Sequence, residues 1–152
     1  MKINYKLLIL CILIPVGLGP LVGFLTSPGN SFQEINQPSF APPGIIFPIV
    51  WTILYTLMGI SSYLILTSDK DNEKALKYYI LQLIVNLTWS FIFFTFRMYI
   101  LAFIWLLVLI YLVVRMIIEF YKVNKLSAYL QIPYLLWIIF ASILNLSISI
   151  LN

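Results

Sequence analysis

The sequence predicts an all-α integral membrane protein, a five-transmembrane-helix bundle with a long first loop that acts as a lid. Composition is the first reason, because 62% of the residues are hydrophobic, 9% are charged and the mean hydropathy is +1.04. So little polar surface cannot cover a soluble globule. Five apolar runs are the second reason, since each approaches the roughly 20 residues that a helix needs to cross a bilayer. The predicted helices cover about residues 7–25, 44–66, 78–96, 99–118 and 128–151. The connections after the first loop are too short for another folded unit, so we expect residues 1–152 to form one domain.

The first run resembles a signal peptide, because Lys2 and Lys6 precede its apolar residues. Pro15 and Pro20 interrupt it, and no small-residue cleavage site follows. We therefore expect a retained helix.

Gly19 and Gly23 lie in this first helix four residues apart. Small residues at this spacing let another helix approach closely. The pair is compatible with packing inside the bundle and with the face of a homodimer.

The first loop, residues 26–43, is long enough to fold over an opening in the bundle. Residues 27–30 read S-P-G-N, which is a turn signal. Phe32, Ile35 and Phe40 supply apolar side chains that can pack downward. A lid and a mobile outer loop are both compatible with these residues.

The second helix follows a proline-rich approach, Q-P-S-F-A-P-P-G-I-I-F-P-I-V-W, that begins at Gln37. Pro42 and Pro43 fix φ, and each restrains the residue before it, so the chain reaches the membrane extended and starts its helix at a defined place. Trp51 and Tyr55 then lie one helical turn apart in an uncharged span.

The third helix carries Gln82, Asn86 and Ser90 at four-residue spacing, which places three hydrogen-bonding side chains in one column. Such groups turn toward the bundle interior or a cavity. They either join helices, at about 0.6 to 2 kcal/mol per hydrogen bond, or line a ligand site. Trp89 adjoins this column.

The fourth helix carries Trp105 and Tyr111, with Arg115 and Glu119 four residues apart near its end. We interpret the last two as a snorkelling arginine and its partner at a membrane face.

The last helix places Pro133, Trp137, Ala141 and Asn145 on one face at four-residue spacing. The proline is expected to bend this helix and free a carbonyl. Below the proline, this face carries a large indole, a small residue that leaves room, and an amide, which together would form one wall of a pocket.

The basic residues predict the orientation, because Lys and Arg in short loops stay on the cytoplasmic side. Eight of the nine fall on one side of the predicted bundle, and Arg97 alone falls on the other. We expect a cytoplasmic amino terminus, with the first loop and the carboxyl terminus outside. This bias accounts for the net charge of +4, and no basic stripe with interleaved aromatics suggests a nucleic-acid partner.

Histidine is absent from the chain and Cys11 is its single cysteine. The usual imidazole ligand, the usual general base and an intramolecular disulfide are therefore unavailable to it. We expect no metal site, no required cofactor and no conventional catalytic residues.

Three of the predicted helices carry motifs that together resemble the translocator protein family (TspO/MBR), also called tryptophan-rich sensory proteins. Their patterns are P-x-W/F-x-P-P with F-x-x-x-W-x-x-L-Y-x-x-M-G, Q-x-x-x-N-x-x-W-S-x-x-F-F, and P-Y-L-x-W-x-x-F-A-x-x-L-N. The matching residues include Pro38, Phe40, Pro42, Pro43, Phe47, Trp51, Leu54, Tyr55, Met58, Gly59, Gln82, Asn86, Trp89, Ser90, Pro133, Tyr134, Trp137, Ala141 and Asn145. The resemblance spans essentially the whole chain and is weakest in the first and fourth helices.

The resemblance implies a bacterial cytoplasmic-membrane protein that binds a porphyrin or another planar hydrophobic molecule in an aromatic cavity, in contact with membrane lipid. The ligand-binding residues would be Phe40, Pro43, Phe47, Trp51, Tyr55, Gln82, Asn86, Trp89, Trp137, Ala141 and Asn145. Because histidine is absent, a metal-free protoporphyrin-like tetrapyrrole fits better than an iron porphyrin. Two alternatives stay open: light- and oxygen-dependent porphyrin breakdown, with a photochemical role for Trp51 and Trp137, and transport of the ligand across the bilayer.

One departure from the family concerns sterols. Vertebrate members continue after the position of Asn145 with a Tyr and then an Arg, the element held responsible for cholesterol recognition. This chain continues L-S-I-S-I-L-N, with neither residue. We therefore expect no specific sterol site.

Overall fold

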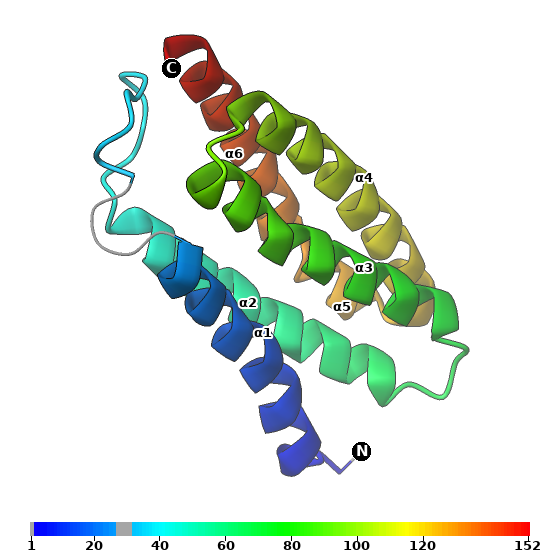
Figure 1. The fold of residues 1–152 in the computed structure, drawn as a ribbon. Coiled ribbons are helices and arrows are strands. Elements are labelled where there is room, and N and C mark those ends of the chain that lie inside the picture. The colour runs from blue at the N-terminus through cyan, green and yellow to red at the C-terminus, as the bar shows by residue number, and fades with distance from the viewer. Residues whose placement is uncertain (1, 27–31) are drawn as a thin grey trace.

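The computed structural model describes residues 2–26 and 32–152, and within them every regular element is a helix (Figure 1). The elements are α1 (Tyr5–Thr26), α2 (Ile46–Leu66), α3 (Glu73–Ser90), the π-helical turn η1 (Phe91–Thr95), α4 (Tyr99–Val123), α5 (Lys125–Tyr129) and α6 (Ile132–Leu151). The described residues form five spans long and apolar enough to cross a membrane. The predicted five-helix membrane bundle is confirmed. The turn predicted at residues 27–30 lies outside the described residues.

The five spans form a single bundle in which α1 packs along α2, and α4 packs against both α3 and α6. The N- and C-terminal ends of the chain lie at opposite ends of the bundle, as an odd number of spans requires (Figure 1). The most buried apolar side chains, such as Met58, Val113, Phe120 and Ile138, lie where these helices meet. Exposed Ile, Leu and Phe side chains cover the outer faces, where a bilayer would solvate them.

Close packing of α1 against α2 depends on two glycines, Gly59 of α2 and Gly19 of α1. A Cβ on Gly59 would lie 2.8 Å from the carbonyl oxygen of Cys11 and against the backbone of Ile12. A Cβ on Gly19 would overlap the ring of Tyr55. The spacing of Gly19 and Gly23 was compatible with packing inside the bundle and with a dimer interface. In the structure Gly19 packs inside the bundle, against Tyr55.

The last span is two helices where the sequence analysis expected one from 128 to 151. Helix α5 ends at Tyr129, a turn passes through Leu130 and Gln131, and α6 restarts at Ile132. Pro133 thus lies in the first turn of α6, where the missing N–H has no helical partner to lose. The sequence analysis expected Pro133 to bend a continuous helix, whereas in the structure it lies at the start of a new one.

Two other helix ends also differ from prediction, since α3 begins at Glu73 rather than 78 and α4 runs to Val123 rather than 118. Apolar runs mark the part of a helix that lies in lipid, whereas the helix itself continues into the polar headgroup region.

The predicted pairing of Arg115 with Glu119 is wrong. The guanidinium of Arg115 lies over the ring of Tyr78, 5.3 Å from its centroid. Glu119, which is buried, accepts from Lys122 Nζ at 3.1 Å, the only ion pair among the described residues. The arginine thus makes a cation–π contact with an aromatic ring on the neighbouring helix α3. The spacing of residues within α4 could not reveal this partner.

Candidate ligand-binding cavity

A cavity of about 430 Å³ lies inside the bundle, toward the end that carries the first loop. All of the long helices contribute side chains to its wall. Eight of the eleven residues predicted to bind a ligand line it: Phe47, Trp51, Tyr55, Asn86, Trp89, Trp137, Ala141 and Asn145. Most of the other lining side chains are apolar, so the interior suits an apolar guest.

Phe40, Pro43 and Gln82 do not line the cavity. Phe40 is half exposed and its ring packs edge-on against Phe140 at 6.4 Å. Pro43 is exposed in the loop, and its carbonyl accepts the backbone N–H of Ile46 where α2 begins. Gln82 is fully buried one turn deeper than Asn86, below the floor of the cavity.

Three tryptophans from three helices bring flat aromatic surfaces to the cavity. Trp51 stacks on Tyr55, with ring centroids 5.2 Å apart and planes 29° apart. Trp89 stacks on Phe93 at 4.9 Å and 25°. Trp137 meets the ring of Phe47 edge-on at 5.9 Å. Each indole is therefore held by an aromatic neighbour, while part of its surface faces the cavity.

A chain of buried hydrogen bonds starts at Tyr55 and Asn86 in the cavity wall and continues into the bundle core. Tyr55 Oη donates to Asn86 Oδ1 at 2.8 Å, and Asn86 Nδ2 donates to Tyr134 Oη at 2.8 Å. Tyr134 in turn donates to Gln82 Oε1 at 2.7 Å. The polar column of α3 therefore joins helices α2, α3 and α6. Asn86 joins helices and also lines the cavity, whereas Gln82 joins helices and does not line it.

Asn145 serves a neighbouring indole. Its Oδ1 accepts from Trp89 Nε1 at 3.1 Å, and its Nδ2 donates to the carbonyl of Tyr99 at 2.9 Å. Asn145 is 1% exposed. Although it lines the cavity, its amide is committed to orienting Trp89.

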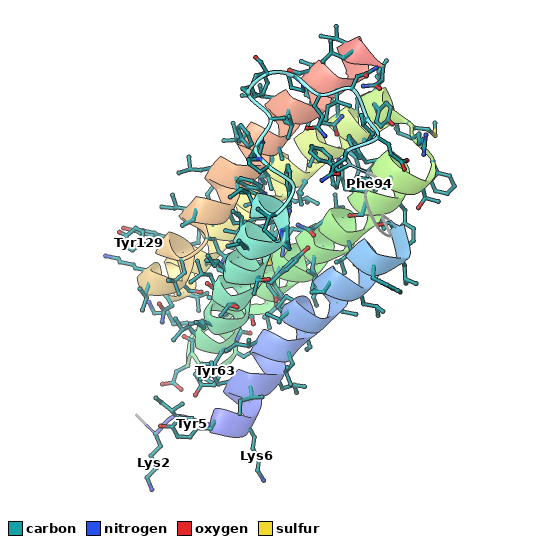
Figure 2. The ribbon with its side chains drawn as sticks, turned by 90° about the vertical axis from the view of Figure 1, so that its left-hand side faces the viewer. Lys2, Tyr5, Lys6, Tyr63, Phe94 and Tyr129 are labelled. Carbon is teal, nitrogen blue, oxygen red and sulfur yellow. The ribbon has the colours of Figure 1, made fainter. Side chains whose placement is uncertain are left out.

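The π-helical turn η1 supplies lining residues that the site prediction missed. The N–H of Phe96 donates to the carbonyl of Phe91 at 2.9 Å, five residues back instead of four. This wider turn lets the consecutive rings of Phe93 and Phe94 both line the cavity. Figure 2 shows Phe94 beside the far end of α1, opposite Lys2 and Lys6. The third-helix motif ends in these two phenylalanines, and this was the signal that could have identified them.

The described part of the first loop packs over the same end of the bundle. Phe32 lines the cavity and meets Phe47 edge-on at 4.8 Å. The loop is also tied to the end of α6, because the Asn36 N–H donates to Asn152 Oδ1 at 3.3 Å and Asn152 Nδ2 donates to the Asn36 carbonyl at 2.9 Å. Residues 32–43 are thus placed as a lid requires.

The cavity also reaches the surface of the bundle at its side. Pro20 and Phe24 of α1, and Pro48 and Thr52 of α2, line it and are exposed. Among the described residues no group of three or more His, Cys, Asp or Glu side chains could hold a metal ion. The cavity is therefore suited to binding by stacking and apolar contact.

Comparison with known proteins agrees with this arrangement. The sequence profile of the TspO/MBR family matches residues 10–151. The chain belongs to the TspO/MBR family. It is 34% identical over 153 residues to the tryptophan-rich protein TspO of Chlorobaculum tepidum, covering 95% of this chain and 97% of that one. It is 34% identical over 138 residues to protein CrtK of Rhodobacter capsulatus, covering 86% and 83%. The human translocator protein is 35% identical over 118 residues, or 75% of this chain and 70% of that one.

Membership in the TspO/MBR family and the five apolar spans establish an integral membrane protein. The resemblance drawn from the motifs of the second, third and last helices is confirmed.

Proposed function

We propose that the protein binds a porphyrin-type planar hydrophobic molecule in the cavity beneath the loop. The observation that carries the proposal is the convergence of Trp51, Trp89 and Trp137 on one apolar hollow. Its volume of about 430 Å³ falls within the roughly 300 to 1,000 Å³ of small-molecule sites. A flat macrocycle can stack on these indoles, and the tetrapyrrole needs no metal ligand from the chain.

The hydrogen-bonding groups in the wall favour shape over charge as the basis of recognition. Tyr55, Asn86 and Asn145 already bond to protein partners. No Lys, Arg, Asp or Glu lines the cavity within the described structure. Charged groups of a ligand would therefore point out toward the loop and solvent, with the ring system inside.

The proposal is tested by titrating purified protein with protoporphyrin in the dark and following porphyrin absorbance and tryptophan fluorescence. We expect saturable binding that Trp51→Phe and Trp137→Phe each weaken by about two- to tenfold, since an aromatic pair contributes about 0.5 to 1.5 kcal/mol. Trp105→Phe is the matched control, because Trp105 bonds to the Val85 carbonyl and does not line the cavity. Equal affinity in both cavity variants, or equal weakening in the control, would remove the cavity as the site.

Light- and oxygen-dependent breakdown of the porphyrin is a second candidate function. It is favoured by the position of Trp51 and Trp137, on α2 and α6, in the wall of one cavity where both can contact an excited ligand. Illumination of the loaded protein in air should bleach the porphyrin, and Trp51→Phe or Trp137→Phe should slow this loss beyond their effect on occupancy. Bleaching at the rate of free porphyrin in detergent would reduce the function to binding.

For location, we propose a bacterial cytoplasmic membrane with the amino terminus inside. The chain end at α1, the connection between α2 and α3, and α5 lie at one end of the bundle (Figure 1). The lysines lie in these segments or in the helix ends that adjoin them. This end would face the cytoplasm. The cavity and the loop would then lie toward the outer face.

A further inference from the structure

A second hollow, of about 410 Å³, lies between α2 and α6. Its wall is apolar and includes Val50, Ile53, Leu136 and Phe140. Ile53 is 55% and Leu136 63% exposed, so the hollow is open to the surface that a bilayer covers. We refer to it as the α2/α6 groove.

Trp137 is the single residue among those described that lines both the cavity and the α2/α6 groove. The indole is therefore part of the wall between them.

Trp137 packs against the hydrophobic core of the bundle and contacts two aromatic rings. Its ring meets Phe47 edge-on at 5.9 Å and lies tilted against Phe140 at 5.4 Å. Its Nε1 is buried and has no hydrogen-bond partner in the described part of the chain. By contrast, Trp89 Nε1 donates to Asn145 at 3.1 Å. Rotation of Trp137 thus breaks no hydrogen bond. It also moves the indole out of a position in which its buried N–H has no acceptor, and such a position is energetically unfavourable.

We infer that Trp137 is a gate between the α2/α6 groove and the cavity, through which a planar hydrophobic ligand dissolved in the bilayer enters and leaves. This inference rests on the proposed function. Such a ligand partitions into acyl chains, where the groove opens. Two other openings lead to the cavity. One lies at the loop, where Phe32 packs against Phe47 and Asn36 is bonded to Asn152. The other lies beside α1 and is lined by Pro20, Phe24 and Thr52.

The motion of the gate can be measured without ligand. Protein labelled with 5-fluorotryptophan in lipid nanodiscs gives one fluorine signal per tryptophan, assigned with single Trp→Phe variants. We expect the Trp137 signal to show microsecond-to-millisecond exchange by relaxation dispersion, the range of gating motions, and the hydrogen-bonded Trp89 signal to show none. Ile53→Phe should fill the groove and suppress the exchange, while Ile100→Phe, on the exposed face of α4, should leave it. A flat profile at Trp137, or equal exchange at Trp89, would overturn the gate.

The route is tested by stopped-flow transfer of protoporphyrin from loaded vesicles to the reconstituted protein. We expect Ile53→Phe to slow association and dissociation alike, about tenfold, with an unchanged Kd, and Ile100→Phe to change neither rate. Slowing by Thr52→Phe with normal rates in Ile53→Phe would assign the route to the opening beside α1 and overturn the inference. Absence of saturable binding to the unaltered protein would refute the proposed function, and the fluorine measurement would still decide the gate.

Discussion

Asn145 of α6 holds the indole of Trp89 of α3 by accepting its N–H at 3.1 Å, and its own amide is anchored to the carbonyl of Tyr99 at 2.9 Å. One side chain thus fixes an aromatic wall of the cavity and joins α6 to the start of α4.

Asn145→Leu should therefore destabilise the protein and loosen Trp89. The change keeps the branched shape of the side chain but leaves the indole N–H of Trp89 without its partner, at a cost of about 1 to 3 kcal/mol for a buried donor. It also removes the bond to the Tyr99 carbonyl, which still accepts a backbone N–H within α4. Thermal unfolding in detergent should show a lower Tm, and protoporphyrin affinity should fall. Ser149→Ala is the control, because Ser149 is only partly buried and its hydroxyl donates to the Leu146 carbonyl of its own helix. An unchanged Tm in Asn145→Leu would show that the pair contributes little.

The glycines at the contact of α1 with α2 should tolerate alanine in a defined order. Gly59→Ala meets the backbone of Cys11 and Ile12, which cannot move aside, so we expect a loss of about 1 to 3 kcal/mol from overpacking. Gly19→Ala meets the Tyr55 ring, which is a side chain and can shift, so the loss should be smaller. Gly17→Ala has no atom within 4 Å of the new Cβ and should be neutral. Equal Tm values for the variants at 59 and 17 would contradict the packing.

The tie between the loop and α6 should be removable without unfolding. Asn152→Ala deletes both hydrogen bonds to the backbone of Asn36, and because both residues are exposed the change should leave the Tm nearly constant. Hydrogen exchange in residues 32–43 should rise about fivefold, which corresponds to roughly 1 kcal/mol of lost protection. Ser149→Ala again serves as the control. Unaltered exchange would mean that aromatic packing alone positions the loop.

The orientation can be decided with reporter fusions. The distribution of Lys and Arg predicts that a phosphatase fused after Asn152 is active, because that end lies outside the cytoplasm. A reporter that works only in the cytoplasm should succeed when it is inserted between Lys70 and Asn72. The opposite result at both positions would invert the proposed topology.

The sequence predicted the number, order and approximate limits of the membrane spans, because apolar length is set by bilayer thickness. It also predicted that Trp51, Asn86 and Trp137 share one cavity, since polar and indole faces avoid lipid. It did not predict the break at Leu130 and Gln131, where no charge or polar run interrupts the apolar pattern.

The sequence also could not predict how deep the cavity extends into the bundle. Gln82 and Asn86 lie on the same helical face, and spacing alone cannot say which of them reaches the hollow. Tyr134 bonds to both side chains, and of the two only Asn86 lines the cavity. Phe40 and Pro43 were included from the motif, but in the structure they shape the loop and the start of α2.

The π-helical turn Phe91–Thr95 gives the third span one more residue than its length across the membrane requires. A single deletion in this turn would restore regular helix and rotate the residues beyond it by about 100°, while the number of spans stayed the same. The sequence could therefore change which rings line the cavity without changing how the chain sits in the bilayer. In this fold, the lining of the cavity and membrane insertion can evolve separately at that turn.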